Sequence, residues 1–385
     1  MWFQSSRSQP SRKRWLRSAL TALAFVVAGG VAACPICLND RAFTLGQKLD
    51  AADRAILAVP VAGEGRFRIA EVVKGEAAVN DILTGLVNGI GATASQDGKP
   101  LLLVSFGPVG RWSSLGAIGS EYAGWLRQLT AFGHAGPSRP MPAWPQVAEK
   151  SSEFAAAEWR ERVALVVPYL EDPEPLVAEI AYGEFARAPY DAQRSVRAQL
   201  TAMQIADWIA DPKLASRRAT YTLLLGIVGT SDDAARLEQR IEAALASHDT
   251  TDLAALLAAD LELRGPSRVG WIETAYFEDR SRTMPEIEAA LLALSVHGSA
   301  DAKVPRQRVI EAYRFFMRER KPMAGFVAPQ LTDWEYWDAT PDFVALLKEN
   351  AIPDPASHFA VLTYLNRSPH LAAKAALESL ADKSQ

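Results

Sequence analysis

Two cysteines, Cys34 and Cys37, are the residues of this chain whose type and spacing best suit covalent chemistry. They are the only cysteines among 385 residues, and they form the motif Cys34-Pro35-Ile36-Cys37. A C-x-x-C pair performs thiol–disulfide exchange when it lies between a strand and a helix N-terminus, because the helix dipole lowers the pKa of the first thiol. A zinc site needs about four ligands, whereas the five histidines are scattered singly. We therefore predict no metal and no cofactor, and keep thiol–disulfide chemistry as an alternative.

The residues before the cysteines have the pattern of an export signal. Residues 1–17 carry five basic and no acidic side chains, and residues 18–33 carry no charge. The apolar run is shorter than the ~20 residues that span a bilayer, so we predict a cleaved signal peptide over residues 1–33 rather than a membrane anchor. This signal predicts an exported bacterial protein, either periplasmic or lipid-anchored at the cell envelope.

The predicted cleavage site, Val31-Ala32-Ala33-Cys34, leaves two processing routes open. It resembles the lipobox of bacterial lipoproteins, which implies lipidation of Cys34 and leaves Cys37 as a lone thiol. The small residues before Cys34 equally suit an ordinary signal peptidase. An unlipidated chain could then form a Cys34–Cys37 disulfide in an oxidising compartment.

The charge balance excludes several classes of partner. The chain carries a formal net charge of −4, and the predicted signal contributes five positive charges, so the mature chain would carry −9. An acidic chain without a basic cluster has little affinity for a nucleic-acid backbone or for anionic lipid. We therefore expect no nucleic-acid partner, and membrane contact only through a lipid on Cys34.

Residues 34–135 are dominated by the period of two that is typical of β-strands. We expect a helix over 39–52, strands over 54–62, 66–73, 81–87, 101–106 and 111–115, and a second helix over 120–132. Five short strands with flanking helices indicate a small open barrel of the OB type. The early cysteine, the following helix and a strand ending in Glu71-Val72-Val73-Lys74-Gly75 resemble netrin-like modules, which implies that fold for this region.

A proline-rich linker over residues 136–148 separates this module from an almost entirely helical remainder, residues 149–385. Around Asp172-Pro173 and Asp211-Pro212, the apolar end of one helix meets the apolar start of the next, and Asp354-Pro355 repeats the pattern. These turns, with Arg217 or Arg218 after the second one, resemble HEAT repeats. The chain as a whole resembles exported bacterial proteins that contain such repeats. The resemblance implies an irregular α-solenoid, in which stacked helix pairs bury apolar faces that no pair buries alone.

Residues 332–338 place three aromatic side chains, Trp334, Tyr336 and Trp337, among three acidic ones. Such aromatics form a partner surface when they are exposed, because aromatic side chains dominate binding hot spots. The alternative is that Trp334 and Trp337, three residues apart, pack over the core where a loop crosses it. Both interpretations stay open at this stage.

The motifs of serine hydrolases, zinc proteases and phosphate-binding loops are absent from the sequence, so we assign no catalytic residue. The sequence predicts an α+β multidomain protein, with a small β-barrel-like domain over 34–135 followed by an irregular all-α HEAT-like solenoid over 149–385. The predicted function is that of a non-enzymatic envelope protein whose solenoid binds another envelope protein. The alternatives are a thiol–disulfide redox factor that uses Cys34 and Cys37, and an enzyme with a site between the two domains.

Overall fold

The computed structural model describes residues 34, 36–37, 43–61, 65–84, 98–107, 111–132, 154–298 and 302–383. A small antiparallel sheet forms its N-terminal part. Its strands are β1 (Arg54–Pro60), β2 (Arg66–Lys74), β3 (Ile82–Thr84), β4 (Leu101–Ser105) and β5 (Trp112–Ala117). They lie in the order β3-β2-β1-β4-β5, and every neighbouring pair is antiparallel. The prediction of five short strands is confirmed, although residues 85–87 of the third lie outside the described part.

The sheet has an apolar cluster on each face. Ile56, Phe67 and Leu103 belong to one cluster, whereas Leu57 and Leu102 belong to the core that the sheet shares with the helices. This double burial follows from the pleat, since successive side chains point to opposite faces. In the described residues β3 and β5 are the edge strands, and each pairs with a neighbour on one side only. The sheet itself is therefore established, and its closure into an OB-type or netrin-like barrel stays a prediction.

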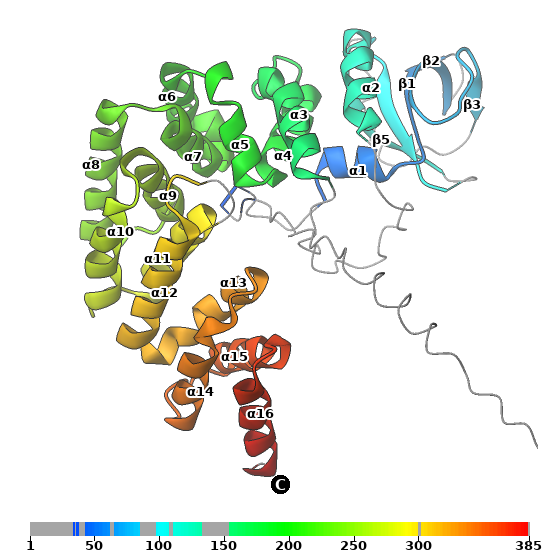
Figure 1. The fold of residues 1–385 in the computed structure, drawn as a ribbon. Helices are drawn as coiled ribbons and strands as arrows, with labels where there is room; N and C mark the ends of the chain where they lie inside the picture. Colours follow the sequence, from blue (N-terminus) through cyan, green and yellow to red (C-terminus); the bar gives the residue numbers. More distant parts are fainter. Residues whose placement is uncertain are drawn as a thin grey trace, which may run out of the picture. The chain divides into compact units, whose positions relative to one another are not determined.

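Two helices flank the sheet where the sequence pattern predicts them. Helix α1 (Leu45–Ala51) begins at a capping box. The Thr44 hydroxyl accepts from Gln47 N–H, and the Gln47 side-chain oxygen accepts from Thr44 N–H. Helix α2 (Ala123–Ala131) follows the 3-10 turn η1 (Ser120–Tyr122) and packs on β2. Figure 1 shows α2 beside the strands, with α1 leading from them toward the first helices of the array.

The rest of the described chain is helical, and with the sheet it makes an α+β protein (Figure 1). The α-helices are α3 (Ala156–Val166), α4 (Pro175–Arg187), α5 (Tyr190–Ser195), α6 (Ala202–Ala210), α7 (Arg218–Val228), α8 (Ser231–Ser247), α9 (Leu253–Arg264), α10 (Ser267–Ile272), α11 (Met284–Gly298), α12 (Arg306–Glu319), α13 (Ala328–Asp333), α14 (Thr340–Lys348), α15 (Pro355–Arg367) and α16 (Leu371–Lys383). Short 3-10 or π turns join them, at η2 (Val167–Tyr169), η3 (Arg197–Gln199), η4 (Pro212–Arg217), η5 (Glu273–Glu278), η6 (Lys321–Val327) and η7 (Trp337–Ala339).

Two of the three Asp-Pro pairs begin helical segments directly, whereas after Asp172-Pro173 the next helix, α4, begins two residues later at Pro175, with Glu174 as its N-cap. The Asp211 carboxylate accepts from Lys213 N–H at the start of η4, and the Asp354 carboxylate accepts from Ser357 N–H at the start of α15. Each aspartate satisfies a free amide of the first turn, and the proline at the next position lacks the N–H that would otherwise be unpaired. These residues therefore set where one helix ends and the next begins.

Alternate helices pack on one another along the middle of the array. Helix α7 packs on α9 and α9 packs on α11, while α6 and α8 pack on α7 and α9 respectively. Gly226 allows the α7–α9 contact, because a Cβ at that position would lie 2.6 Å from the Ala259 Cα.

No helix in the described part of the chain is long and apolar enough to cross a membrane. The predicted signal peptide and the linker over 136–148 lie outside the described residues.

Candidate functional site

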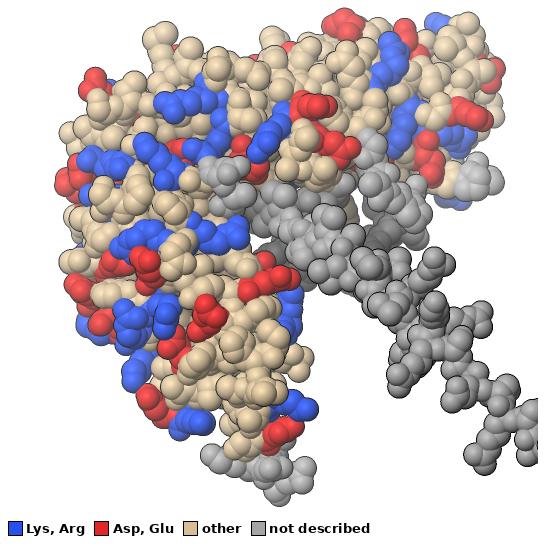
Figure 2. All heavy atoms as spheres, viewed as in Figure 1, with Lys and Arg blue, Asp and Glu red and all other residues tan. Residues whose placement is uncertain are grey.

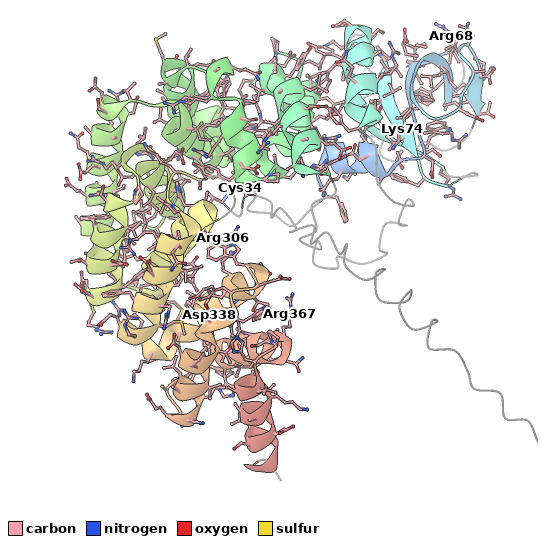
Figure 3. All side chains as sticks on the ribbon, in the orientation of Figure 1. Cys34, Arg68, Lys74, Arg306, Asp338 and Arg367 are labelled. Carbon is pink, nitrogen blue, oxygen red and sulfur yellow. The ribbon has the colours of Figure 1, made fainter. Side chains whose placement is uncertain are left out.

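Cys34 and Cys37 lie together in a turn that is held by the first helices of the array. Both residues are 3% exposed, and their sulfur atoms are 2.7 Å apart. Cys34 N–H donates to the Ala188 carbonyl between α4 and α5. The Cys37 carbonyl accepts from the hydroxyls of Tyr182 on α4 and Thr220 on α7, at 3.2 and 3.1 Å. Figure 3 labels Cys34 close to α4 and α5. Helices α4 and α7 and the connection between α4 and α5 therefore fix the backbone of this turn.

The two thiols have opposite electrostatic environments. Burial raises the pKa of Cys34, but hydrogen bonds from the Cys37 thiol and from the backbone of Ile36 and Cys37 outweigh burial and lower it. Burial, together with the neighbouring Cys34 sulfur, raises the pKa of Cys37 well above its ordinary value. The Gln193 side chain on α5 lies against the Cys37 sulfur, with its Nε2 at 3.5 Å, and donates to the Phe185 carbonyl at 2.9 Å. Cys34 is therefore the thiol that deprotonates first.

This geometry favours a bond between the two sulfurs over reaction with another molecule. A thiolate attacks only a group that it can reach, and both sulfur atoms are enclosed. The adjacent sulfurs need little movement to form a disulfide, which would hold the N-terminal segment in its turn. A bulky lipid on the Cys34 sulfur would have to displace that sulfur from its place beside Cys37.

The described residues hold no group of three or more candidate metal ligands.

The aromatic segment lies partly buried between helices. The Trp334 ring stacks on the Tyr313 ring, with centroids 5.7 Å apart and planes within 7°, and the Arg306 guanidinium lies 5.3 Å above it. The Trp337 ring packs on Tyr364 at 5.2 Å, and Trp334, Tyr336 and Trp337 all contact the main core. Packing thus occupies a large part of each ring, which favours the packing interpretation and leaves only their exposed edges for a partner.

Four charged side chains meet in the interior where α1 joins the helical array. They are Asp50 of α1, Arg162 of α3, and Glu184 and Arg187 of α4, and each is at most 5% exposed. Arg162 Nη2 donates to both Asp50 oxygens, at 2.9 and 2.7 Å, and its Nε donates to Glu184. Arg187 contacts both carboxylates at 2.7 Å. Both guanidinium groups lie over the Phe154 ring, at 4.7 and 5.5 Å.

The pKa values of the two carboxylates in this cluster are shifted in opposite directions. Burial raises the pKa of Asp50, since its two arginine neighbours do not offset the cost of removing the charge from water. Burial also acts to raise the pKa of Glu184, but the adjacent Arg187 and Arg162 outweigh it and lower the pKa. The cluster joins residues 112 positions apart, Asp50 and Arg162, and so connects α1, which leads into β1, with α3 and α4.

Two cavities open among the helices. One of about 580 Å³ lies beside α5, α7, α8 and α9, and one of about 180 Å³ lies beside η2, η3 and α6. All their lining residues lie at or beyond Val167, so neither cavity includes a residue of the sheet. Neither is therefore a site between the two predicted domains, where the enzyme alternative placed one.

The sequence identified the cysteine pair but not the residues that hold it. Gln193, Tyr182 and Thr220 lie far from Cys37 in sequence, and no motif marks them. The i,i+3 pair Glu184–Arg187 is a readable signal for an ion pair, but nothing in the sequence indicates that it is buried. No family model matches the chain, and no curated protein or solved structure is significantly similar to it.

Proposed function

We propose that the chain is a non-enzymatic exported protein whose helices from α3 onward form an irregular α-solenoid that binds another envelope protein. One repeated contact carries the proposal. A basic side chain in one helix pair donates to a carbonyl near the end of a helix 37 to 47 residues earlier. The four examples are Arg217 to Leu170, Arg282 to Leu245, Lys303 to Leu263 and Arg320 to Phe277.

These contacts have a common physical basis. The last carbonyls of a helix lack an internal partner and carry the negative end of the helix dipole, so a cation placed there is favourable. A spacing of about 40 residues is that of two-helix repeats such as HEAT and armadillo units. The succession of α7, α9 and α11 supports the same interpretation, because each unit of a solenoid packs mainly on its neighbours.

A protein ligand suits the surface better than a polynucleotide. Lys and Arg are interspersed with Asp and Glu over the helices on the face seen in Figure 2, so charges of both signs are available there. Phe359 on α15 is 71% exposed and Leu371 at the start of α16 is 85% exposed. Solenoids present long surfaces of this mixed kind to protein partners, and exposed aromatics are frequent anchors in protein interfaces.

The binding proposal is tested by recovering and reconstituting a complex. Affinity purification of the tagged full-length protein from cross-linked envelopes should yield one stoichiometric partner. The purified partner should then bind the mature chain with a saturable isotherm. The control is the same tagged chain without residues 1–33, which stays inside the cell and should not recover that protein. The proposal fails if no protein recovered from the envelope binds the purified mature chain.

We further propose that Cys34 and Cys37 form a structural disulfide after export. The two thiols would lose two protons and two electrons to a disulfide-bearing oxidant of that compartment. The intact mass of the native mature protein tests this, after alkylation with and without prior reduction. We expect an unlipidated chain that gains two alkyl groups only after reduction. A chain that begins at Cys34 with a diacyl or triacyl group, and takes one alkyl group on Cys37, would instead establish a lipoprotein.

A redox factor is the second candidate, because the pKa of Cys34 is lowered while that of Cys37 is raised. A low first and high second pKa is the division of roles that a C-x-x-C catalyst uses. The burial of both thiols opposes this candidate. A redox factor should alkylate within seconds at neutral pH in its reduced folded form and should reduce a protein disulfide. A structural pair should alkylate only on unfolding.

A further inference from the structure

The larger cavity is lined by basic side chains from separate parts of the helical region. Arg194 of α5, Arg197 of η3, Arg264 of α9 and Lys303 before α12 face it, and Glu262 is its one acidic lining residue. The cavity has a volume of about 580 Å³, which lies within the range of about 300–1,000 Å³ that small-molecule sites occupy. A local excess of positive charge in a chain of net charge −4 calls for a specific explanation.

Two of the four cations are already neutralised. Arg194 Nε donates to Glu262 at 2.9 Å, and Arg264 contacts Asp260 at 2.8 Å and Glu238 at 2.7 Å. These pairs hold their guanidinium groups in place. They therefore contribute shape and polarity to the wall and little net charge.

The other two cations lack a carboxylate partner in the described part of the chain. Arg197 makes no hydrogen bond or ion pair with any described residue, and the Lys303 ammonium donates to the Leu263 carbonyl at 2.8 Å. Glu262 contacts neither of them; its carboxylate instead accepts from Arg194 and from the Tyr190 hydroxyl at 3.0 Å. The cavity therefore offers two uncompensated positive charges to whatever enters it.

The remaining polar wall adds to this field. Thr230 and Ser231, at the N-terminal end of the 17-residue helix α8, also line the cavity. Asp233 in the first turn is turned toward its own helix, where its carboxylate accepts from Thr230 N–H at 2.8 Å, and it does not line the cavity. The positive end of the α8 dipole therefore faces the same space as Arg197 and Lys303.

We propose that this cavity binds a small compound that carries a phosphate group or several carboxylate groups. The Arg197 guanidinium would form paired hydrogen bonds to an oxyanion, which is the geometry that arginine recognises best. The Lys303 ammonium would act as a second point charge on the same ligand. The inference concerns a small-molecule site and does not depend on the proposed protein-binding role.

Calorimetric titration of the full mature chain with pyrophosphate and with citrate tests the site. We expect saturable 1:1 binding of at least one probe with a Kd below about 1 mM, an affinity of about 4 kcal/mol. Arg197→Gln and Lys303→Gln should each weaken it about tenfold, and the double variant should abolish it. Arg66→Gln on β2 is the matched control, because it removes the same charge from an exposed position outside the cavity, and it should bind as the parent does.

Two outcomes would overturn the proposal. One is the absence of saturable binding by either probe. The other is equal weakening by Arg66→Gln, which would mean that the ions respond only to total charge. The unfolding midpoint of each variant is measured alongside. We expect no change for the exposed Arg197→Gln, and a small decrease for Lys303→Gln, which loses the contact with the Leu263 carbonyl. Should Lys303→Gln unfold, Arg197→Gln alone decides, since Arg197 has no partner to lose in the described residues.

Discussion

Charged side chains join the elements of this protein in two ways, and the difference lies in their exposure to water. Where α1 meets α3 and α4, Asp50, Arg162, Glu184 and Arg187 are at most 5% exposed. Where α12 meets α14, the Arg314 and Asp342 side chains form a 3.0 Å ion pair while 42% and 39% exposed. Arginine–carboxylate pairs thus occur in this protein both in a buried site and in a solvent-exposed one.

These two contacts between elements, the buried joint and the exposed joint, should differ in what they contribute to stability. A buried cluster costs much free energy to assemble, because each charge loses its hydration. Removing any one of its members is strongly destabilising, because a buried charge is then left without its partner. An exposed pair is assembled at little cost and contributes little, because water and salt screen it. The sheet region is therefore held by a joint that specifies one geometry, and the later helices are held mainly by their apolar contacts.

Breaking the buried joint should give the largest effect. Arg162→Met removes the guanidinium that contacts Asp50 and Glu184, and leaves the buried Asp50 carboxylate with a single arginine neighbour. We expect a loss of about 3–5 kcal/mol in the free energy of unfolding, measured by urea denaturation. Arg160→Met is the matched control on the same helix, because the Arg160 side chain is 47% exposed, and it should cost at most about 1 kcal/mol. Similar losses in both variants would contradict the distinction between the joints.

Neutral packing provides the next test, because the α7–α9 contact depends on close approach rather than on charge. In Gly226→Ala the added Cβ would lie 2.6 Å from the Ala259 Cα and 2.9 Å from its Cβ. We expect a loss of about 1–3 kcal/mol, since overpacking forces the helices apart. The control is Gly270→Ala on α10, where a Cβ meets nothing within 4 Å. There alanine should stabilise the helix by about 0.5–1 kcal/mol. If both variants gain stability, α7 and α9 are not closely packed.

Local patterns in the sequence predicted most of the elements. Alternation such as Arg66-Phe67-Arg68-Ile69 identified β2, and Asp354-Pro355 identified the start of α15. These signals operate within a few residues, where propensity and capping decide the conformation. The α+β class is thus readable from the sequence, whereas closure of the sheet and the repeat character of the helices depend on contacts between distant segments.

The candidate sites were less predictable for the same reason. The motif Cys34-x-x-Cys37 was visible, but its burial depends on Tyr182, Gln193 and Thr220, which reach the turn only after the helices have packed. The spacing of Trp334 and Trp337 left packing and exposure open, since helical spacing alone does not say which face is covered. The basic cavity combines residues from four segments that no local pattern connects.

A joint of intermediate character should respond to pH. Burial acts to raise the pKa of Glu286, but hydrogen bonds from Thr283, His248 and Arg282 lower it to about 2. Since the ordinary value is 4.5, the ionised form stabilises the fold fully above about pH 4.5, and this stability is lost as the pH falls toward 2. Glu286→Gln should therefore cost about 1–3 kcal/mol at pH 7, and much less near pH 2.5.

Urea denaturation at both pH values measures this difference. Glu288→Gln, an exposed position two residues further along α11, serves as the control and should change stability little at either pH. A Glu286→Gln variant that loses the same free energy at pH 7 and at pH 2.5 would show that the carboxylate charge is not what stabilises this joint.

The exposed joint should give the smallest effect and the clearest dependence on salt. Arg314→Gln removes the 3.0 Å contact with Asp342, and we expect a loss of about 0.2–1 kcal/mol at low ionic strength. At 1 M NaCl the Debye length falls to about 3 Å, so parent and variant should then unfold at the same urea concentration. Arg162→Met should keep most of its deficit at 1 M NaCl, because salt does not enter a site from which water is excluded. If salt instead restores Arg162→Met, the buried cluster is open to solvent and the two joints are of one kind.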